Sequence, residues 1–291
     1  MINEFERSIL KEIDYNQEFN NMIKFGSIFE DDPSVYVPTA YGGDFSSKKV
    51  LTMEFIDGEK LADVISSEGI YDKKLIANRG IESYFKQIVD YGFFHADPPH
   101  PSNIYILKDN IVCYIDFGMM GVLDDEFKEN LTELFIYFIE KNINGMINQL
   151  SYMGILPDDL DLKALKYDLI DLMGKYYGVE LKGGIHGGML DLITIMRKYN
   201  VILPREFVLI SKGLSMLEET GIELDPEFNT INTLEPYAKK IIRKELNPFK
   251  LVDFVKKNIF EIEHILKTVP MNISKVLYKI EEGGTKNRTR T

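Results

Sequence analysis

The sequence is poor in several residue types that often carry structure or chemistry. Its 291 residues include no tryptophan, four histidines and one cysteine, Cys113. A single cysteine excludes an intramolecular disulfide framework and fits a reducing compartment, and we expect Cys113 to fill a position in a buried strand. The histidines, the cysteine and the aspartates show no zinc-ligand spacing, so we predict no transition-metal site.

Positive charge is also scarce. The chain has 34 lysines and arginines against 46 aspartates and glutamates, which gives a formal net charge of −12. A nucleic-acid-binding surface needs a basic stripe, so we predict no nucleic-acid partner. This charge does not exclude ATP, because metal ions bring positive charge to the phosphates.

Long hydrophobic runs are missing as well. No apolar run approaches the ~20 residues of a membrane span, and residues 1–4 do not resemble a signal peptide. We therefore expect a cytoplasmic protein, either soluble or attached peripherally to a membrane. With 45% hydrophobic and 27% charged residues, the composition is that of an ordinary globular chain.

The most informative stretch of the sequence runs from Tyr91 to Gly121. Two apolar segments, 104–107 and 111–115, surround a polar turn and predict a β-hairpin. The hairpin would bring Asn103 and Asp116, at its two ends, within metal-sharing distance, while Asp97 precedes it. Phosphoryl transfer on ATP needs this order, in which one carboxylate faces the acceptor and an amide and a second carboxylate hold metal ions.

These residues resemble the catalytic core of the UbiB/AarF/ADCK family of atypical protein-kinase-like proteins. Members typically read F-x-H-A-D-P-H-P-x-N and then an apolar strand ending in D-F-G; this chain reads FFHADPPHPSN and later YIDFG. Outside the core, residues 51–58 resemble the family's hinge, 12–18 its E-x-D signature and helix glutamate, and 201–204 its later large lobe. The resemblance covers nearly the whole chain.

The resemblance implies a function for the residues of the core. Asp97 would be the general base or the carboxylate that orients the acceptor, and Asn103 and Asp116 would bind Mg²⁺ as part of a Mg²⁺–ATP complex. Magnesium suits such oxygen ligands and retains waters, so two protein ligands plus phosphate oxygens are enough. His95 joins this catalytic set by position, although we expect its ring to make structural hydrogen bonds.

The resemblance also implies a nucleotide site formed by the small lobe. Adenine would dock on backbone groups of Glu54, Phe55 and Ile56. The acidic residues Glu12, Asp14 and Glu18 would lie in the middle of a helix over residues 4–30.

Glu18 matches the glutamate that normally pairs with the lysine that grips the phosphates. Neither that lysine nor a phosphate-covering loop is found before Glu12. We therefore expect Glu18 to have lost its partner, and a half-buried lone carboxylate is destabilising or takes up a proton.

The fold class that follows is α+β, a protein-kinase-like fold consisting mostly of the helical large lobe. We expect a fragment that lacks most of the small lobe. The predicted small-lobe remnant (1–57) contains the long helix, a β-hairpin of two strands (35–37 and 50–55) joined through residues 42–44, and the hinge. A helical large lobe (58–282) with the catalytic loop and the D-F-G hairpin follows, and then a disordered tail (283–291).

Helical periodicity predicts the rest of the large lobe. Residues 119–123 are expected to run directly into the first of the later helices, and the glycine-rich segment 183–188 is interpreted as a flexible helix connector, because it lacks the strand and the Lys-Ser/Thr of a phosphate-binding loop. The predicted helices are 59–66, 73–92, 124–141, 142–153, 158–177, 187–199, 204–220, 234–245, 248–266 and 270–281.

One departure from the family pattern concerns the catalytic loop. Pro98 and Pro99 stand where the family has a single proline, so Asp97 and Asn103 are six residues apart. The extra residue is either absorbed as a bulge or moves Asn103 off the metal, and a displacement of about 1 Å can cost ~100-fold in rate.

Two kinds of function remain open at this point. The first is an ATP-binding ATPase or phosphotransferase, which the resemblance connects to isoprenoid quinone (ubiquinone-type) biosynthesis or lipid handling, with ATP, a lipid or quinone precursor and a membrane surface as partners. The alternative is a catalytically dead pseudokinase or truncated large lobe that acts only as a binding module. The missing lysine and the lengthened loop favour the alternative.

Overall fold

The computed structural model describes residues 14–97, 100–157, 159–176 and 184–245. The chain divides into two compact units, Met1–Ala238 and Lys239–Thr291, and the contacts described below lie within the first. Glu12, the helices predicted over 248–266 and 270–281, and the tail predicted over 283–291 lie outside the described residues.

The first described helix, α2 (Tyr15–Ile28), begins at an aspartate. The backbone of Asp14 is extended, and its carboxylate accepts a hydrogen bond from the Asn16 N–H at 3.2 Å. A side-chain oxygen at this position satisfies one of the amides that the first turn leaves unpaired. A continuous helix through residues 4–30 is therefore wrong, because Asp14 caps α2 instead of lying inside it.

The main sheet has four short strands in the order β1-β7-β6-β4. β6 and β7 form the predicted antiparallel hairpin, with Ile104 opposite Tyr114. β1 runs parallel to β7, and β4 runs antiparallel to β6. The strands are β1 (Val35–Tyr36), β4 (Glu59–Lys60), β6 (Ile104–Ile106) and β7 (Val112–Tyr114).

The predicted pairing of 35–37 with 50–55 is wrong. Val35 is buried in the core beneath the hairpin, so β1 joins β7 there. The segment around residue 52 forms β3 (Thr52–Met53) and pairs antiparallel with β2 (Ala40–Tyr41) in a separate two-stranded sheet.

A third pair of strands flanks the catalytic loop and was not predicted. β5 (Phe93–His95) pairs antiparallel with β8 (Met120–Val122), so residues 119–123 form a strand before the next helix begins. Gly121 permits this pairing, since a Cβ there would lie 2.4 Å from the Phe94 ring.

Eight further helices are described. Aspartate or asparagine side chains cap the first turns of α4, α5 and α6, as expected for helix starts. The helices are α3 (Leu61–Ser66), α4 (Lys73–Val89), α5 (Asp125–Ile139), α6 (Ile143–Tyr152), α7 (Leu162–Tyr176), α8 (Gly184–Lys198), α9 (Arg205–Leu224) and α10 (Thr230–Glu245).

Several of the predicted helix boundaries are wrong. Residues 59 and 60 form β4, because they pair with β6. α8 begins at Gly184, and its first turn packs on Tyr176 where a connector was expected. α10 begins four residues before the predicted start and contains Pro236, because Asn229 caps it through the Asn232 N–H at 2.9 Å.

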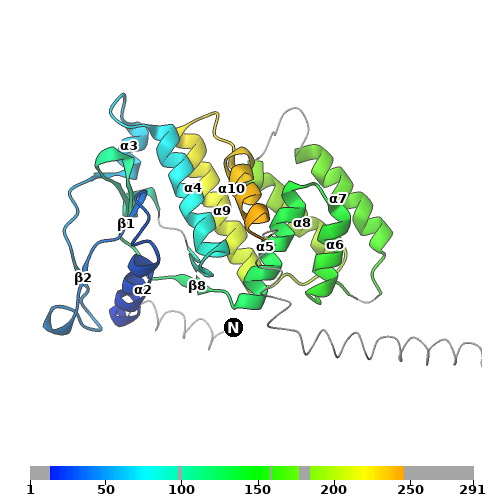
Figure 1. Ribbon diagram of the computed structural model, residues 1–291, viewed down its shortest axis with the longest axis horizontal. Helices are drawn as coiled ribbons and strands as arrows, with labels where there is room; N and C mark the ends of the chain where they lie inside the picture. The colour runs from blue at the N-terminus through cyan, green and yellow to red at the C-terminus, as the bar shows by residue number, and fades with distance from the viewer. Residues whose placement is uncertain (1–13, 98–99, 158, 177–183, 246–291) are drawn as a thin grey trace, which may run out of the picture. The chain divides into compact units, whose positions relative to one another are not determined.

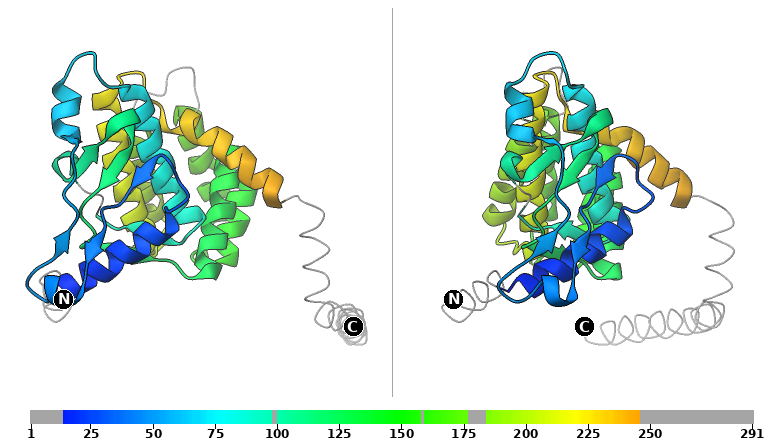
Figure 2. Two further views of the ribbon diagram at one scale, coloured as in Figure 1. Left: turned by 60° about the vertical axis from the view of Figure 1, so that its left-hand side comes forward. Right: turned by 90° about the vertical axis from the view of Figure 1, so that its left-hand side faces the viewer.

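Three hydrophobic cores hold the elements together. The first lies between α2, α3, α4 and the four-stranded sheet, and Figure 2 shows α2 and α4 against that sheet. The second joins α4, β5, α9 and the start of α10, and the third joins α5, α6, α7, α8 and α9. α4 and α9 lie side by side, as Figure 1 shows, so the helix that leads into the catalytic loop is braced by a helix from much later in the chain. Within the described ranges, no helix is long and apolar enough to cross a membrane.

Candidate functional site

The two predicted magnesium ligands meet at the end of the hairpin. Asn103 Nδ2 donates a hydrogen bond to Asp116 Oδ2 at 3.1 Å, and Asp116 Oδ1 accepts one from the Gly118 N–H at 3.1 Å. The register of β6 and β7 produces this contact, because Ile104 pairs with Tyr114. The predicted proximity is therefore present, while metal binding by this pair stays a prediction.

The extra proline does not separate Asn103 from Asp116. Residues 98–99 lie outside the described part of the chain, but the short 3-10 turn η2 (Pro101–Asn103) that follows is well defined. His100 caps this turn, since its Nδ1 accepts from the Ser102 N–H at 3.3 Å, and its carbonyl accepts from the Asn103 N–H at 2.7 Å. The turn holds Asn103 at the start of β6.

The carboxylate of Asp97 has a partner that the sequence did not indicate. Lys212, in the middle of α9, donates a hydrogen bond to Asp97 Oδ1 at 2.7 Å. Both side chains are about half exposed, so the pair faces solvent at the edge of the catalytic loop. No local pattern could have identified Lys212, because 115 residues separate it from Asp97.

His95 is buried within the structure and does not face the site. Burial lowers the pKa of its imidazole to about 3, so the ring is neutral. Its backbone N–H donates to Gln87 Oε1 at 3.0 Å, and the Tyr84 hydroxyl donates to its carbonyl at 3.2 Å. The hydrogen bonds that hold His95 are therefore made by its backbone and not, as predicted, by its ring, and Nε2 has no hydrogen-bond partner among the described residues.

The ring of His95 belongs to an aromatic cluster that joins α2 to the D-F-G segment. Its centroid lies 5.1 Å from Phe25, 5.4 Å from Tyr114 and 5.5 Å from Phe117. Phe25 on α2 also contacts Phe117 at 5.2 Å. Such aromatic contacts contribute about 0.5–1.5 kcal/mol each beyond area burial, so the cluster fixes Phe117 and, with it, the neighbouring Asp116.

Glu18 has a partner, contrary to the prediction that it lost one. Its carboxylate accepts the Phe117 N–H at 3.2 Å, and Asn21 Nδ2, one turn later on α2, donates to the Phe117 carbonyl at 2.9 Å. Burial raises the pKa of Glu18, the Phe117 hydrogen bond lowers it, and the charge of Asp116 raises it further. The net direction is upward, which agrees with the expected tendency to take up a proton.

The segment predicted to bind adenine follows β3. The Glu54 carboxylate accepts from the Tyr36 hydroxyl at 2.9 Å and from the Thr39 N–H at 3.0 Å, and these bonds hold its pKa below the ordinary value. The Glu54 N–H donates to the Thr39 carbonyl at 2.8 Å and is therefore engaged within the chain. Phe55 is 90% exposed and Ile56 partly exposed, so contacts to adenine at these positions stay a prediction.

Among the described residues, no group of three histidine, cysteine or acidic side chains could hold a metal ion. The oxygens of Asn103 and Asp116 are nevertheless the hard donors that magnesium prefers, and the remaining ligands would be phosphate oxygens and water. The residues present therefore fit Mg²⁺ bound together with a nucleotide better than they fit an isolated metal ion.

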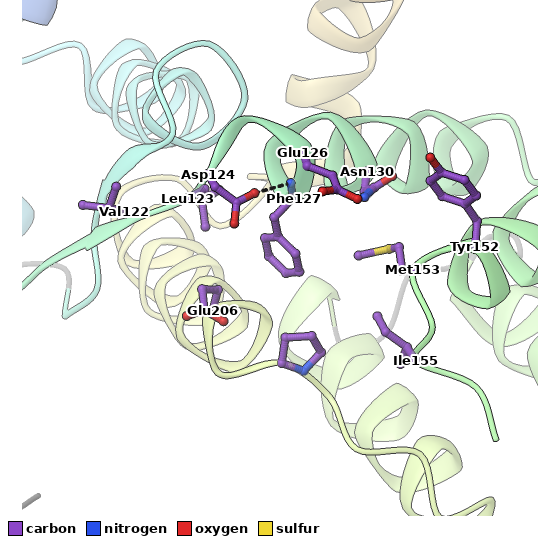
Figure 3. A pocket seen from close by; sticks show the side chains of 11 residues that line it. Val122, Leu123, Asp124, Glu126, Phe127, Asn130, Tyr152, Met153, Ile155 and Glu206 are labelled. Carbon is purple, nitrogen blue, oxygen red and sulfur yellow. Dashed lines mark hydrogen bonds between the residues drawn. The ribbon is translucent and has the colours of Figure 1, made fainter. Parts of the chain in front are cut away.

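A cavity of about 400 Å³ lies elsewhere. Figure 3 shows it between the start of α5, the end of α6 and the start of α9, where Asp124 caps α5 through the Phe127 N–H at 2.7 Å. Its carboxylates, from Asp124, Glu126 and Glu206, would repel a triphosphate, and none of the predicted site residues lines it. This cavity is not the nucleotide site.

Three features together define an atypical protein-kinase-like protein. They are the helical large lobe, the hairpin that ends in D-F-G, and helix α2, which is hydrogen-bonded to Phe117. Residues 1–150 match the ABC1 atypical kinase-like domain, and residues 169–229 match the UbiB helical domain. The chain belongs to the ABC1/UbiB family of atypical kinase-like proteins.

Individual relatives agree with this assignment. The chain is 32% identical over 264 residues to an uncharacterized protein of Synechocystis, covering 89% of this chain and 46% of that protein. It is 30% identical over 294 residues to the chloroplastic ACTIVITY OF BC1 COMPLEX KINASE 7 of Arabidopsis thaliana (97% and 42%), and 28% identical over 270 residues to the probable protein kinase UbiB of Enterobacter (90% and 49%). The chain thus spans less than half the length of each relative.

A solved structure supports the fold. The complex of Rv3197 with erythromycin from Mycobacterium tuberculosis matches with a TM-score of 0.58 at 21% sequence identity, covering 77% of this chain and 57% of that one. At this identity the match shows the kinase-like fold alone.

Proposed function

We propose that the chain is the ATP-binding part of an atypical kinase-like ATPase or phosphotransferase that acts in isoprenoid quinone biosynthesis or lipid handling. Asn103 and Asp116 bind Mg²⁺, and Asp97 faces the acceptor. The observation that carries the proposal is the contact between Asn103 and Asp116, two oxygen-bearing side chains that the hairpin brings together, with Asn103 Nδ2 3.1 Å from Asp116 Oδ2.

The metal pair has the surroundings that magnesium chemistry needs. α2 and the aromatic cluster fix Phe117 from both sides of its peptide unit, so the orientation of Asp116 is set before a ligand binds. A preorganised carboxylate costs less to order when the metal–nucleotide complex arrives. The positive charge of Mg²⁺ also offsets the repulsion between Glu18 and Asp116.

Asp97 is placed to act on an acceptor without binding the metal. It stands two residues past the buried end of β5, and its carboxylate is half exposed beside Lys212. An exposed carboxylate can accept a proton from, or orient, a hydroxyl or a water that attacks the γ-phosphate. Lys212 fixes the orientation of the carboxylate and brings positive charge near the developing phosphate charge.

A lipid or quinone-precursor substrate and contact with a membrane surface belong to the same proposal. They are supported by membership of the family and not by a surface of this chain.

The second candidate is a pseudokinase or binding module. The observation in its favour is the position of Glu18, whose carboxylate bonds to the backbone of Phe117 where an active kinase would pair it with a lysine. A chain of this kind would retain the kinase shape and bind nucleotide weakly or not at all.

A thermal-shift experiment distinguishes these candidates. The melting temperature of the wild-type chain should rise with Mg²⁺–ATP by mass action, and Asp116→Asn should lose most of that rise, because an amide replaces the charged ligand. Asp109→Asn is the matched control, since it makes the same substitution in the turn at the other end of the hairpin. It should keep the full shift.

Two other outcomes have defined meanings. A melting temperature that ignores Mg²⁺–ATP in the wild type contradicts nucleotide binding by this chain and leaves the binding-module candidate. A rise that does not require Mg²⁺ and survives Asp116→Asn supports a pseudokinase that holds nucleotide without the metal pair.

A further inference from the structure

A second cavity lies inside the helical part of the chain, and none of the predicted site residues lines it. Its volume is about 160 Å³, and its walls come from α4 to α9 and the start of α10. The lining side chains are apolar except for the hydroxyl of Tyr176, which donates a hydrogen bond to Asp191 at 2.8 Å. Among the described residues, none of those that line the cavity is charged.

The walls of this cavity offer a water molecule few hydrogen-bond partners. A buried water needs two to four polar partners, and the one hydroxyl in the wall is already engaged. A cavity of about 150 Å³ lined by aliphatic and aromatic side chains stays dry in other proteins and binds benzene or xenon.

We propose that this cavity is a binding site for a small uncharged apolar molecule, or for the apolar end of a larger one, of about the size of an alkylated benzene ring. Binding would be favourable because the ligand leaves water and makes dispersion contacts with the apolar walls. The proposal stands apart from nucleotide binding, because no residue of the Asn103–Asp116 pair lines the cavity.

The walls can adapt to the shape of a ligand. Three methionines, Met146 on α6, Met173 on α7 and Met189 on α8, contribute to the lining. Methionine has three rotatable bonds and a polarisable sulfur, so it fills irregular space and re-packs around different apolar groups. Three methionines from three helices therefore suit a site for shape-varied hydrophobic molecules.

The cavity shares two helices with the catalytic loop. Ile210 and Leu214 of α9 line it, and Lys212, which binds Asp97, lies between them in the sequence. Phe85 and Ile88 of α4 also line it, and α4 leads into β5. A bound molecule would therefore pack against the two elements that hold Asp97.

Toluene titrated into the full chain, labelled with ¹³C at the methionine methyl groups, tests the proposal. The methyl signals of Met146, Met173 and Met189 should shift in the ring current of the bound probe. Met22 in α2 and Met53 in β3 do not line the cavity, so their methyl signals should not shift. Phenol should bind at least about tenfold more weakly, because the one acceptor in the wall, the Tyr176 hydroxyl oxygen, offsets only part of the cost of burying its hydroxyl.

Two helical glycines provide a matched pair of variants. Gly188 lines the cavity, where a Cβ would be in ordinary contact with the Tyr176 ring at 3.7 Å, so Gly188→Leu should fill the space and abolish the shifts. A Cβ at Gly174, on the exposed side of α7, would meet no atom within 4 Å. Gly174→Leu should therefore bind toluene like the wild type. Leu172→Phe is a second filling variant, in case Gly188→Leu does not fold.

The proposal is overturned if the three methionine signals do not move at saturating toluene. It is also overturned if they move equally in a folded filling variant, or if phenol binds as well as toluene. Because the readout uses no nucleotide, a failure here is separate from a failure of Mg²⁺–ATP binding.

Discussion

Lys212 Nζ lies 2.7 Å from Asp97 Oδ1, although 115 residues separate the two in the sequence. α9 carries Lys212 to the loop because it packs along α4, the helix that precedes β5 and Asp97. Both side chains are about half exposed, and exposed ion pairs contribute only about 0–1 kcal/mol to stability. The contact therefore matters for the orientation of the carboxylate more than for the fold.

Lys212→Met should lower Mg²⁺–ATP turnover by about 10- to 100-fold, with the Mg²⁺–ATP thermal shift unchanged. The reason is that the substitution frees the Asp97 carboxylate without touching the metal pair. Lys212→Arg should recover part of the rate, since a guanidinium can also donate to a carboxylate. An equal loss in Arg205→Met, at the start of the same helix, would show that the effect is not specific to the contact with Asp97.

Asp97→Asn and Asp116→Asn should separate catalysis from binding. Each should abolish turnover, in this chain and in a full-length relative. Asp116→Asn should also weaken Mg²⁺–ATP binding, whereas Asp97→Asn should leave it largely intact, because Asp97 is placed toward the acceptor. Isothermal titration with Mg²⁺–ATP measures the difference. The reverse pattern would overturn the assignment of the two roles.

Glu18→Gln should make the chain more stable at pH 7. A raised pKa means that the folded chain binds more protons than the unfolded chain above the ordinary value of 4.5, so stability falls as the pH rises through that window. Glutamine removes the charge beside Asp116 and still offers an oxygen to the Phe117 N–H. Urea unfolding at pH 7 and pH 4 should show an advantage at pH 7 that shrinks at pH 4. A less stable variant at pH 7 would mean that the charge of Glu18 stabilises the fold.

His95→Phe should remove a pH dependence of stability. The unfolded chain protonates His95 near the ordinary value of 6.5, whereas burial lowers the pKa in the folded chain to about 3. Stability therefore falls as the pH drops from 6.5 toward 3, by about 2 kcal/mol at pH 5. Phenylalanine keeps the aromatic contacts, so the difference in unfolding free energy between pH 7 and pH 5 should shrink by about that amount. Identical pH profiles in urea would contradict the buried, neutral assignment.

The sequence determined the part of the site that is built from neighbouring residues. Two apolar segments around Lys108, Asp109 and Asn110 predict the hairpin, and Asp109 and Asn110 take the left-handed backbone that these residue types tolerate. Once the hairpin forms, its register brings Asn103 close to Asp116. The helices from α4 to α9 were likewise predicted from apolar periodicity, with errors confined to their ends.

Tertiary packing decided the contacts that join distant segments. Four contacts depend on which apolar faces meet. They are the pairing of β1 with β7, the pairing of β8 with β5, the hydrogen bond between Glu18 and Phe117, and the position of Lys212 beside Asp97. From the sequence alone, a short strand could pair with several other strands, and a charged side chain with several opposite charges. Local backbone preferences do not favour one of these pairings over another. Burial of apolar side chains in the cores selects one pairing, and this selection is visible only in the folded structure.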